Sequence, residues 1–101
     1  MLFRKAKALK DLCEARVGIL KKLSFEQLSK LQSTHETPEI CGKKGNMNLI
    51  FEKHGEGELM VVVQGDVPTF LIGRHWHVGG FVVQPDGNKR ELTDEEVLFY
   101  D

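Results

Sequence analysis

One uninterrupted apolar run constrains this fold more than any other feature of the sequence. Residues 59–63 read LMVVV, and three of the five are β-branched valines. A half-buried strand alternates apolar and polar residues, whereas a continuous apolar run is typical of a strand that is central in its sheet or buried on both faces. The run is also much shorter than the roughly 20 residues that a membrane-spanning helix needs. We therefore predict a sheet built around residues 58–64 and no membrane partner.

The segments on either side of this run also have strand patterns. NLIFEKH, residues 48–54, alternates Leu49 and Phe51 on one face, and the GEG that follows predicts a turn into the central strand. After Gly65, Asp66 and Pro68, we expect TFLIG, residues 69–73, to form an edge strand or an extended crossing segment.

The last predicted strands form a hairpin. HWHVGGFVVQ, residues 75–84, reads as a strand, and PDGN, residues 85–88, places proline and glycine where a hairpin turn requires them. KREL, residues 89–92, is then the returning strand. These segments predict an antiparallel meander of four to five strands.

The first third of the chain is predicted to be helical. Apolar residues recur at helical spacing through the first 23 residues, while most lysines fall elsewhere. Gly18 is a weak point, because glycine inside a helix costs about 1 kcal/mol relative to alanine. The segment is therefore either one helix with a soft position or two shorter helices.

Two capping boxes predict further helices. Ser24 with Gln27 has the spacing in which each side chain bonds the backbone N–H of the other residue, so a short helix should begin there and end before the mid-thirties. Thr93 with Glu96 repeats the spacing, and three acids follow Thr93, where the helix dipole favours them. We expect a helical turn over residues 93–99.

Together these elements predict an α+β fold: N-terminal helices packed on an antiparallel four- to five-stranded meander sheet, with a short C-terminal helical turn. With 101 residues the chain has the size of one domain. We expect a single domain over 1–101, with a helical part at 1–33, the sheet at 46–92 and the turn at 93–99. Residues between the helical part and the sheet, rich in Gly, Pro, Thr and Lys, are predicted to form a loop.

Cysteines and charge add expectations about location and partners. Cys13 and Cys41 lack the spacing of a zinc or redox motif, and the N-terminus lacks the apolar block of a secretory signal, so we expect a cytoplasmic protein with free thiols. The net charge is −1, yet residues 1–22 carry seven basic and two acidic side chains, and residues 86–101 carry six acidic and two basic ones. This polarity could steer an anionic partner, or it could simply keep two faces solvated.

The stretch GRHWHVGG, residues 73–80, is the most unusual local feature. His75 and His77 lie two apart on a predicted strand, so both imidazoles project to one face, where they could bind a divalent transition metal. A catalytic metal needs a third protein ligand, and His54 is the candidate, although Glu52, Asp66, His35 and Cys41 are alternatives that spacing does not separate. The alternative is that both histidines are ordinary half-exposed strand residues.

The same stretch also predicts a binding patch. If pleating is regular, His75, His77, Phe81 and Val83 share one face and Trp76, Val78, Val82 and Gln84 share the other. A bulge at Gly79-Gly80 would bend the strand and project Arg74, His75, Trp76 and His77 beyond the core. Arginine and tryptophan often anchor interfaces. The alternative places Trp76 in the core against the N-terminal helices.

No motif names a reaction, so we expect binding rather than catalysis, with no cofactor. The main hypothesis is a small binding protein that engages a protein partner or itself, as a homodimer, through the strand end at Arg74–His77. One alternative is a metal-dependent site centred on His75 and His77, with His54. A further alternative is nucleic-acid binding through the basic N-terminal helix, with the aromatic strand stacking on bases. The slightly acidic net charge opposes it.

Overall fold

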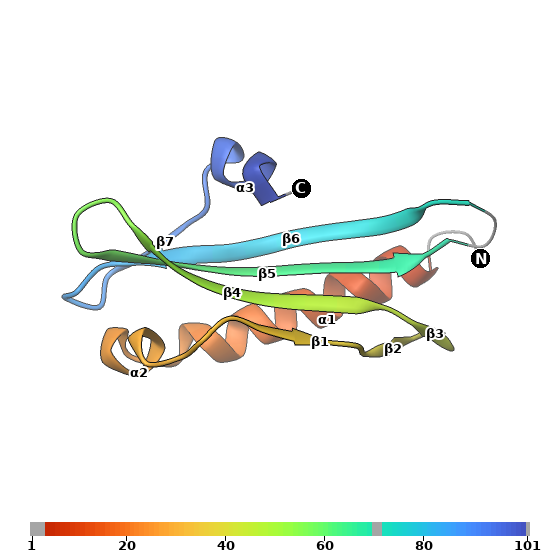
Figure 1. The fold of residues 1–101 in the computed structure, drawn as a ribbon, viewed down its shortest axis with the longest axis horizontal. Coiled ribbons are helices and arrows are strands. Elements are labelled where there is room, and N and C mark those ends of the chain that lie inside the picture. The colour runs from red at the N-terminus through yellow and green to blue at the C-terminus, as the bar shows by residue number, and fades with distance from the viewer. Residues whose placement is uncertain (1–3, 70–71, 101) are drawn as a thin grey trace.

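The computed structural model describes residues 4–69 and 72–100. An antiparallel five-stranded sheet is covered on one face by helix α1, Arg4–Lys21, and on part of the other face by helix α3, Asp94–Tyr100 (Figure 1). The predicted α+β class, with an N-terminal helical region, an antiparallel sheet and a C-terminal helix, is confirmed. Within the described ranges, no helix is both long enough and apolar enough to cross a membrane.

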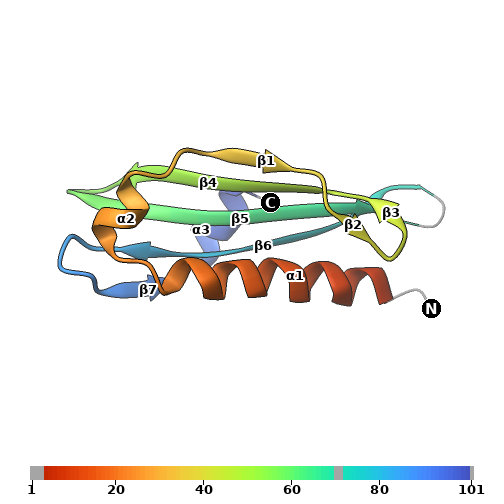
Figure 2. The same ribbon diagram turned by 90° about the horizontal axis from the view of Figure 1, so that it is seen from below.

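The sheet has the strand order β1-β4-β5-β6-β7. Its long members are β4, Asn46–His54, β5, Glu58–Pro68, and β6, Arg74–Val83, while β1, Thr34–Glu36, and β7, Lys89–Glu91, are short edge strands. Two further strands, β2, Glu39–Ile40, and β3, Lys43–Lys44, pair only with each other. A five-residue helix α2, Phe25–Ser29, follows α1. The long strands extend along the whole sheet (Figure 2), so their register determines which side chains meet.

Strand β5 is the central strand, as its apolar run predicted. All five residues from Leu59 to Val63 are buried. Leu59, Val61 and Val63 face the core beneath α1, while Met60 and Val62 pack against Val82 and Tyr100 on the opposite face. A strand that is covered on both faces has no solvent-exposed face for polar residues, which explains why the apolar run of β5 is continuous.

Helix α1 runs without a break through Gly18, so the one-helix alternative is confirmed. Its buried stripe consists of Leu9, Cys13, Val17 and Leu20. Burial raises the pKa of the Cys13 thiol to about 11. The thiol is therefore protonated at neutral pH and packs as a small apolar group.

Both predicted capping boxes form. Ser24 Oγ accepts the N–H of Gln27 at 3.1 Å, and the Gln27 side chain accepts the N–H of Ser24 at 2.9 Å. Thr93 and Glu96 make the same reciprocal pair at 3.2 and 2.8 Å. Such boxes involve only residues three apart, so local sequence is sufficient to predict them. The PDGN hairpin is also confirmed, since the N–H of Gln84 bonds the carbonyl of Asn88 at 2.8 Å.

Three local predictions need correction. Residues 34–44, expected as loop, include β1 and the β2-β3 hairpin. β1 is polar in sequence, and it is fixed to α1 by Arg16, which donates to both carboxylate oxygens of Glu36 at 2.6 and 3.0 Å and lowers the Glu36 pKa. Residues 69–73, expected as an edge strand or an extended crossing segment, form neither where described: Thr69, Ile72 and Gly73 lie in the connection between the antiparallel neighbours β5 and β6, and residues 70–71 lie outside the described ranges.

The third correction concerns the glycine pair. Each residue of β6 from Arg74 to Val83 has a consecutive partner on β5, so no bulge interrupts the strand at Gly79-Gly80. Gly80 instead lies so close to β5 that a Cβ atom would be 2.0 Å from the Val61 carbonyl oxygen. The glycine allows close approach of two backbones, which is the other common reason for glycine inside a strand.

Glu96 is expected to make stability fall in acid. Its carboxylate accepts both Arg90 guanidinium bonds at 2.9 and 3.1 Å and the Thr93 N–H, which together lower its pKa from 4.5 to about 2. The unfolded chain therefore binds the proton first as pH falls, so this stabilisation is complete above about pH 5 and is lost progressively towards pH 2.

Urea unfolding from pH 7 to pH 2 tests this expectation. Glu96→Gln should be less stable than wild type at neutral pH and should lose less stability on acidification, with a residual slope from Glu36. Glu95→Gln, on the same exposed turn, is the matched control. Equal acid slopes for Glu96→Gln and wild type would contradict the prediction.

Candidate binding edge

Strand β6 is much longer than β7, its neighbour on the outer side of the sheet. β7 pairs with Phe81, Val82 and Val83 only. Within residues 4–69 and 72–100, no strand pairs with the outer edge of β6 from Arg74 to Gly80. Figure 2 shows β7 at one end of β6, with α1 running along the remainder. In an antiparallel sheet every second residue of such an edge directs its N–H and C=O away from the neighbouring strand.

The side chains of this edge divide between the two faces of the sheet. His75 and His77 share the α1 face with Phe81 and Val83, as regular pleating predicted, whereas Arg74 and Trp76 point to the α3 face. The predicted patch of Arg74, His75, Trp76 and His77 is therefore not one surface. Its four residues share the backbone edge and lie alternately above and below it.

Trp76 is a surface residue with 53% of its area exposed. It lies in register with Asp66 and, through β5, with Asn46, on the side of the sheet opposite α1. The alternative that placed Trp76 in the core against the N-terminal helices is therefore wrong. α3 packs over Met60 and Val62, several residues away along the strands.

Arg74 is fixed by a buried carboxylate. Asp66 is 7% exposed, and its Oδ1 accepts Arg74 Nε at 2.6 Å and Asn46 Nδ2 at 3.0 Å. A charged group buried to this extent requires such compensation. The network stabilises the β5-β6 hairpin at the end of the sheet where the free edge begins.

A cavity of about 380 Å³ lies between the free edge and α1. Its walls are Glu14, Val17, Gly18 and Lys21 of α1, residues 77–80 of β6, and Glu91 at the end of β7. It therefore occupies the space into which β7 would continue if it were longer. Burial lowers the pKa of His77, Glu14 opposes this change and Lys10 adds to it, so His77 is mainly neutral at pH 7.

Sequence reasoning missed the α1 side of this cavity. Lys10, Glu14 and Gly18 are exposed residues four apart, so they share one flank of α1. Gly18, which the sequence marks as a weak point of the helix, borders the cavity. The i, i+4 spacing was the available signal, but only the packing of α1 on β5 and β6 shows that this flank lies beside a free edge.

The predicted metal ligands do not meet. His77 aligns through Gly65 with Met47, and His54 lies seven residues further along β4, roughly 23 Å away at about 3.3 Å per residue, on the opposite face. His54 Nε2 instead contacts Glu96 at 2.9 Å. The described part of the chain contains no group of three His, Cys, Asp or Glu side chains placed to hold a metal ion.

The two supports for nucleic-acid binding lie on opposite sides of the sheet. The basic helix α1 covers one face and Trp76 projects from the other, so a nucleic-acid strand bound along the lysines of α1 would not reach the Trp76 indole. Lys7, Arg16 and Lys21 also form ion pairs with Asp11, Glu36 and Glu91. Paired cations contribute less to phosphate binding than free ones.

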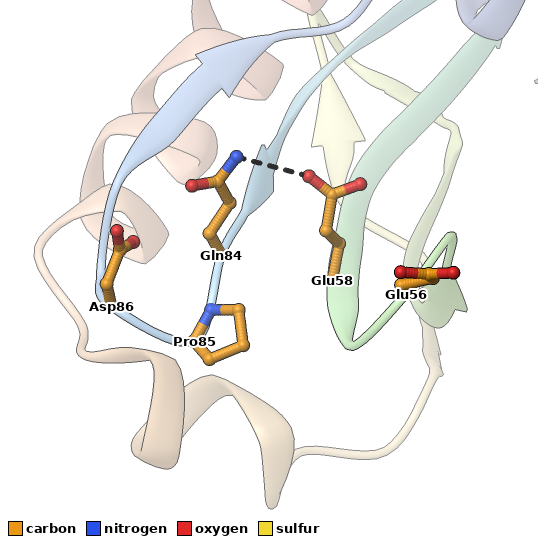
Figure 3. A pocket seen from close by; sticks show the side chains of 5 residues that line it. All are labelled: Glu56, Glu58, Gln84, Pro85 and Asp86. Carbon is orange, nitrogen blue, oxygen red and sulfur yellow. Dashed lines mark hydrogen bonds between the residues drawn. The ribbon is translucent and has the colours of Figure 1, made fainter.

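A second cavity, of about 400 Å³, lies at the tips of the β4-β5 and β6-β7 hairpins. Figure 3 shows Gln84 and Glu58 pointing towards each other, with Glu56 and Asp86 on the flanking turns. Its charged lining consists of carboxylates, and Pro85 completes it. This arrangement provides neither a general base beside a nucleophile nor a cation for an anionic ligand.

Comparison of the chain with known protein families, curated proteins and solved structures finds no match. The candidate site is therefore defined by its geometry: a seven-residue strand edge, Arg74–Gly80, with a cavity on its α1 side and Trp76 on its other side.

Proposed function

We propose that this chain is a binding protein that adds an extended protein strand to the free edge of β6. The observation that carries the proposal is the difference in length between β6 and β7, which leaves residues 74–80 without an outer neighbour in the described ranges. Strand addition satisfies the outward N–H and C=O groups of the edge, and flanking side chains then select the sequence that binds.

The two edges of the sheet differ in how well they are protected. Charged side chains, proline and bulges are common ways to prevent strands from adding to an edge. On the β1 side, the part of β4 beyond β1 carries exposed Glu52 and Lys53. Apart from Arg74, which is bonded to Asp66, the edge residues 74–80 of β6 carry no Lys, Arg, Asp, Glu or Pro, and they run without a bulge. This edge is therefore open to pairing.

The cavity beside the edge supports the same function. A strand that continues the line of β7 would place alternate side chains over Gly79 and towards Glu14 and Gly18 on α1. The other side chains of that strand would lie beside Trp76, which offers a large, partly exposed ring. Backbone bonds would supply affinity, and these two surfaces would supply selectivity.

Adjacent proline variants test strand addition. Of His77 and Val78, one directs its N–H outward and the other bonds β5, because the direction alternates along an antiparallel strand. Amide exchange identifies the outward residue by its faster exchange. Peptides that bind the wild-type chain can be selected from a displayed random library. Proline at the outward position should weaken their binding at least about tenfold, because one backbone hydrogen bond to the peptide is lost and the proline ring hinders its approach.

The neighbouring proline is the internal control, because it removes a bond to β5. It should lower the free energy of unfolding, whereas the outward variant should largely retain stability. Equal binding of the selected peptides by wild type and the outward proline variant would refute strand addition, and so would a wild-type edge that binds neither a selected peptide nor a second copy of the chain.

A further inference from the structure

Resting on the strand-addition function proposed above, we infer that the added strand is β6 of a second copy of this chain. The two β6 edges pair antiparallel about a two-fold axis, with His77 of one copy opposite His77 of the other. The result is a continuous ten-stranded sheet in which each copy provides the missing neighbour of the other. The length of the edge, its side chains and the flank of α1 all support this register.

The length of the free edge selects the register. The edge is bounded at Gly80 by β7, which pairs from Phe81 onward, and at Arg74 by the connection from β5. The register that pairs residue 74 with residue 80 of the second copy uses all seven free positions of both strands. A shift in one direction brings the incoming strand against β7, and a shift in the other leaves edge positions unpaired.

This register also places complementary side chains opposite each other. Trp76 lies opposite Val78 of the second copy, and an aromatic residue facing a β-branched one is a favourable cross-strand pair. His75 lies opposite Gly79, and Arg74 lies opposite Gly80, so each of these two bulky side chains faces a glycine, which has no side chain to clash with it. The two-fold symmetry produces each of these pairs twice.

The α1 helices meet at the same axis. His77 is in register with Gly65, and a Cβ on Gly65 would be 2.7 Å from Cys13 Sγ and 2.9 Å from Leu9 Cδ1, so the axis crosses α1 between residues 9 and 13. α1 packs on both β5 and β6. If it lies midway between them, the two α1 helices are about two strand spacings, roughly 10 Å, apart, which suits helix packing.

Charges on the facing flank complete the interface. Lys10 and Glu14 are exposed, and they lie at or next to the segment of α1 between residues 9 and 13 that the axis crosses, with Glu14 lining the same cavity as His77. Antiparallel helices related by an axis near residue 12 bring Lys10 of one copy opposite Glu14 of the other, twice. Gly18, which has no other described side chain within 4 Å of an added Cβ, leaves room for the approach.

Charge exchange tests the partner and the register together. Sedimentation equilibrium of the full chain should show a dimer. Lys10→Glu and Glu14→Lys should each weaken dimerisation about tenfold, since each puts like charges opposite each other twice. The double variant Lys10→Glu/Glu14→Lys should recover most of the affinity. Circular dichroism checks that each variant is folded.

Cysteine cross-linking tests the axis directly. In a Cys13→Ala/Cys41→Ser background, which removes the thiol of Cys13 beside position 77, His77→Cys should form an intermolecular disulfide when oxidised glutathione accepts the two electrons, because the two thiols face each other. His75→Cys faces Gly79 and should remain largely monomeric on a non-reducing gel.

A strict monomer at the highest attainable concentration would overturn the second copy as partner, and so would a dimer cross-linked at position 75 rather than 77. Selected peptides that bind a monomeric chain would leave strand addition intact. The two proposals therefore fail by different results.

Discussion

Gly80→Ala is expected to destabilise this protein by about 3–5 kcal/mol, a large part of the stability of a small domain. A Cβ at position 80 would lie 2.0 Å from the Val61 carbonyl oxygen and 3.0 Å from the Val62 Cα, and both contacts are with backbone. The residue also has φ near +152°, which side chains rarely adopt. Relief would require β6 to move away from β5 at the centre of the sheet.

Gly79→Ala is the matched control at the neighbouring position. A Cβ there would be 3.7 Å from Val17 Cγ2 and 3.8 Å from His77 Nε2, which are ordinary contacts. Alanine restricts the unfolded chain more than glycine does, so the change should be neutral or stabilising by up to about 1 kcal/mol.

Urea unfolding followed by far-ultraviolet circular dichroism distinguishes the two glycine variants. Both should be measured at one low protein concentration, because association would add to apparent stability. Similar free energies of unfolding for Gly79→Ala and Gly80→Ala would mean that the close approach of β6 to β5 is wrong.

The parts of the fold that depend on neighbouring residues were predictable from sequence. The valine run of β5, the Ser24 and Thr93 caps and the PDGN turn each operate within a few residues, so their chemistry is visible in the sequence. The face shared by His75 and His77 also followed from strand alternation alone. These predictions needed no knowledge of what packs on the sheet.

The predictions that were wrong concern features that depend on packing between residues far apart in the sequence. Burial of Trp76 is decided by where α3 lies, and α3 packs over Met60 and Val62 instead. β1 has a polar sequence and forms beside β4, with Glu36 held by Arg16 of α1. Sequence shows that Gly79 and Gly80 lack side chains but not which backbone comes close to them, so it predicts a bulge where the structure has close packing of two strands.

The candidate site illustrates the same limit. The residue types of GRHWHVGG mark this stretch as unusual in the sequence, and its residues 74–80 form the free edge. What makes it an edge, however, is that β7 pairs with residues 81–83 only. Strand length at a sheet border reflects the whole chain path, so the sequence of β6 alone could not reveal it.

Removal of the Arg74 guanidinium should produce the other large effect. The Asp66 side chain is 10% exposed and accepts Arg74 and Asn46. Arg74→Met would leave a buried carboxylate with the Asn46 amide as its remaining described partner. A buried charge that loses its counter-ion is strongly destabilising, so we expect a loss of about 2–4 kcal/mol at pH 7.

A double-mutant cycle separates the ion pair from the lost packing of the Arg74 side chain. Asp66→Asn in the Arg74→Met background removes the uncompensated charge, so the double variant should be more stable than Arg74→Met alone, with a coupling energy of about 1–3 kcal/mol. If the two substitutions were simply additive, Asp66 would not depend on Arg74, and the hairpin next to the binding edge would be held by its backbone bonds. A measured coupling would instead show that a buried ion pair fixes the side chain of Arg74, which is the first residue of that edge.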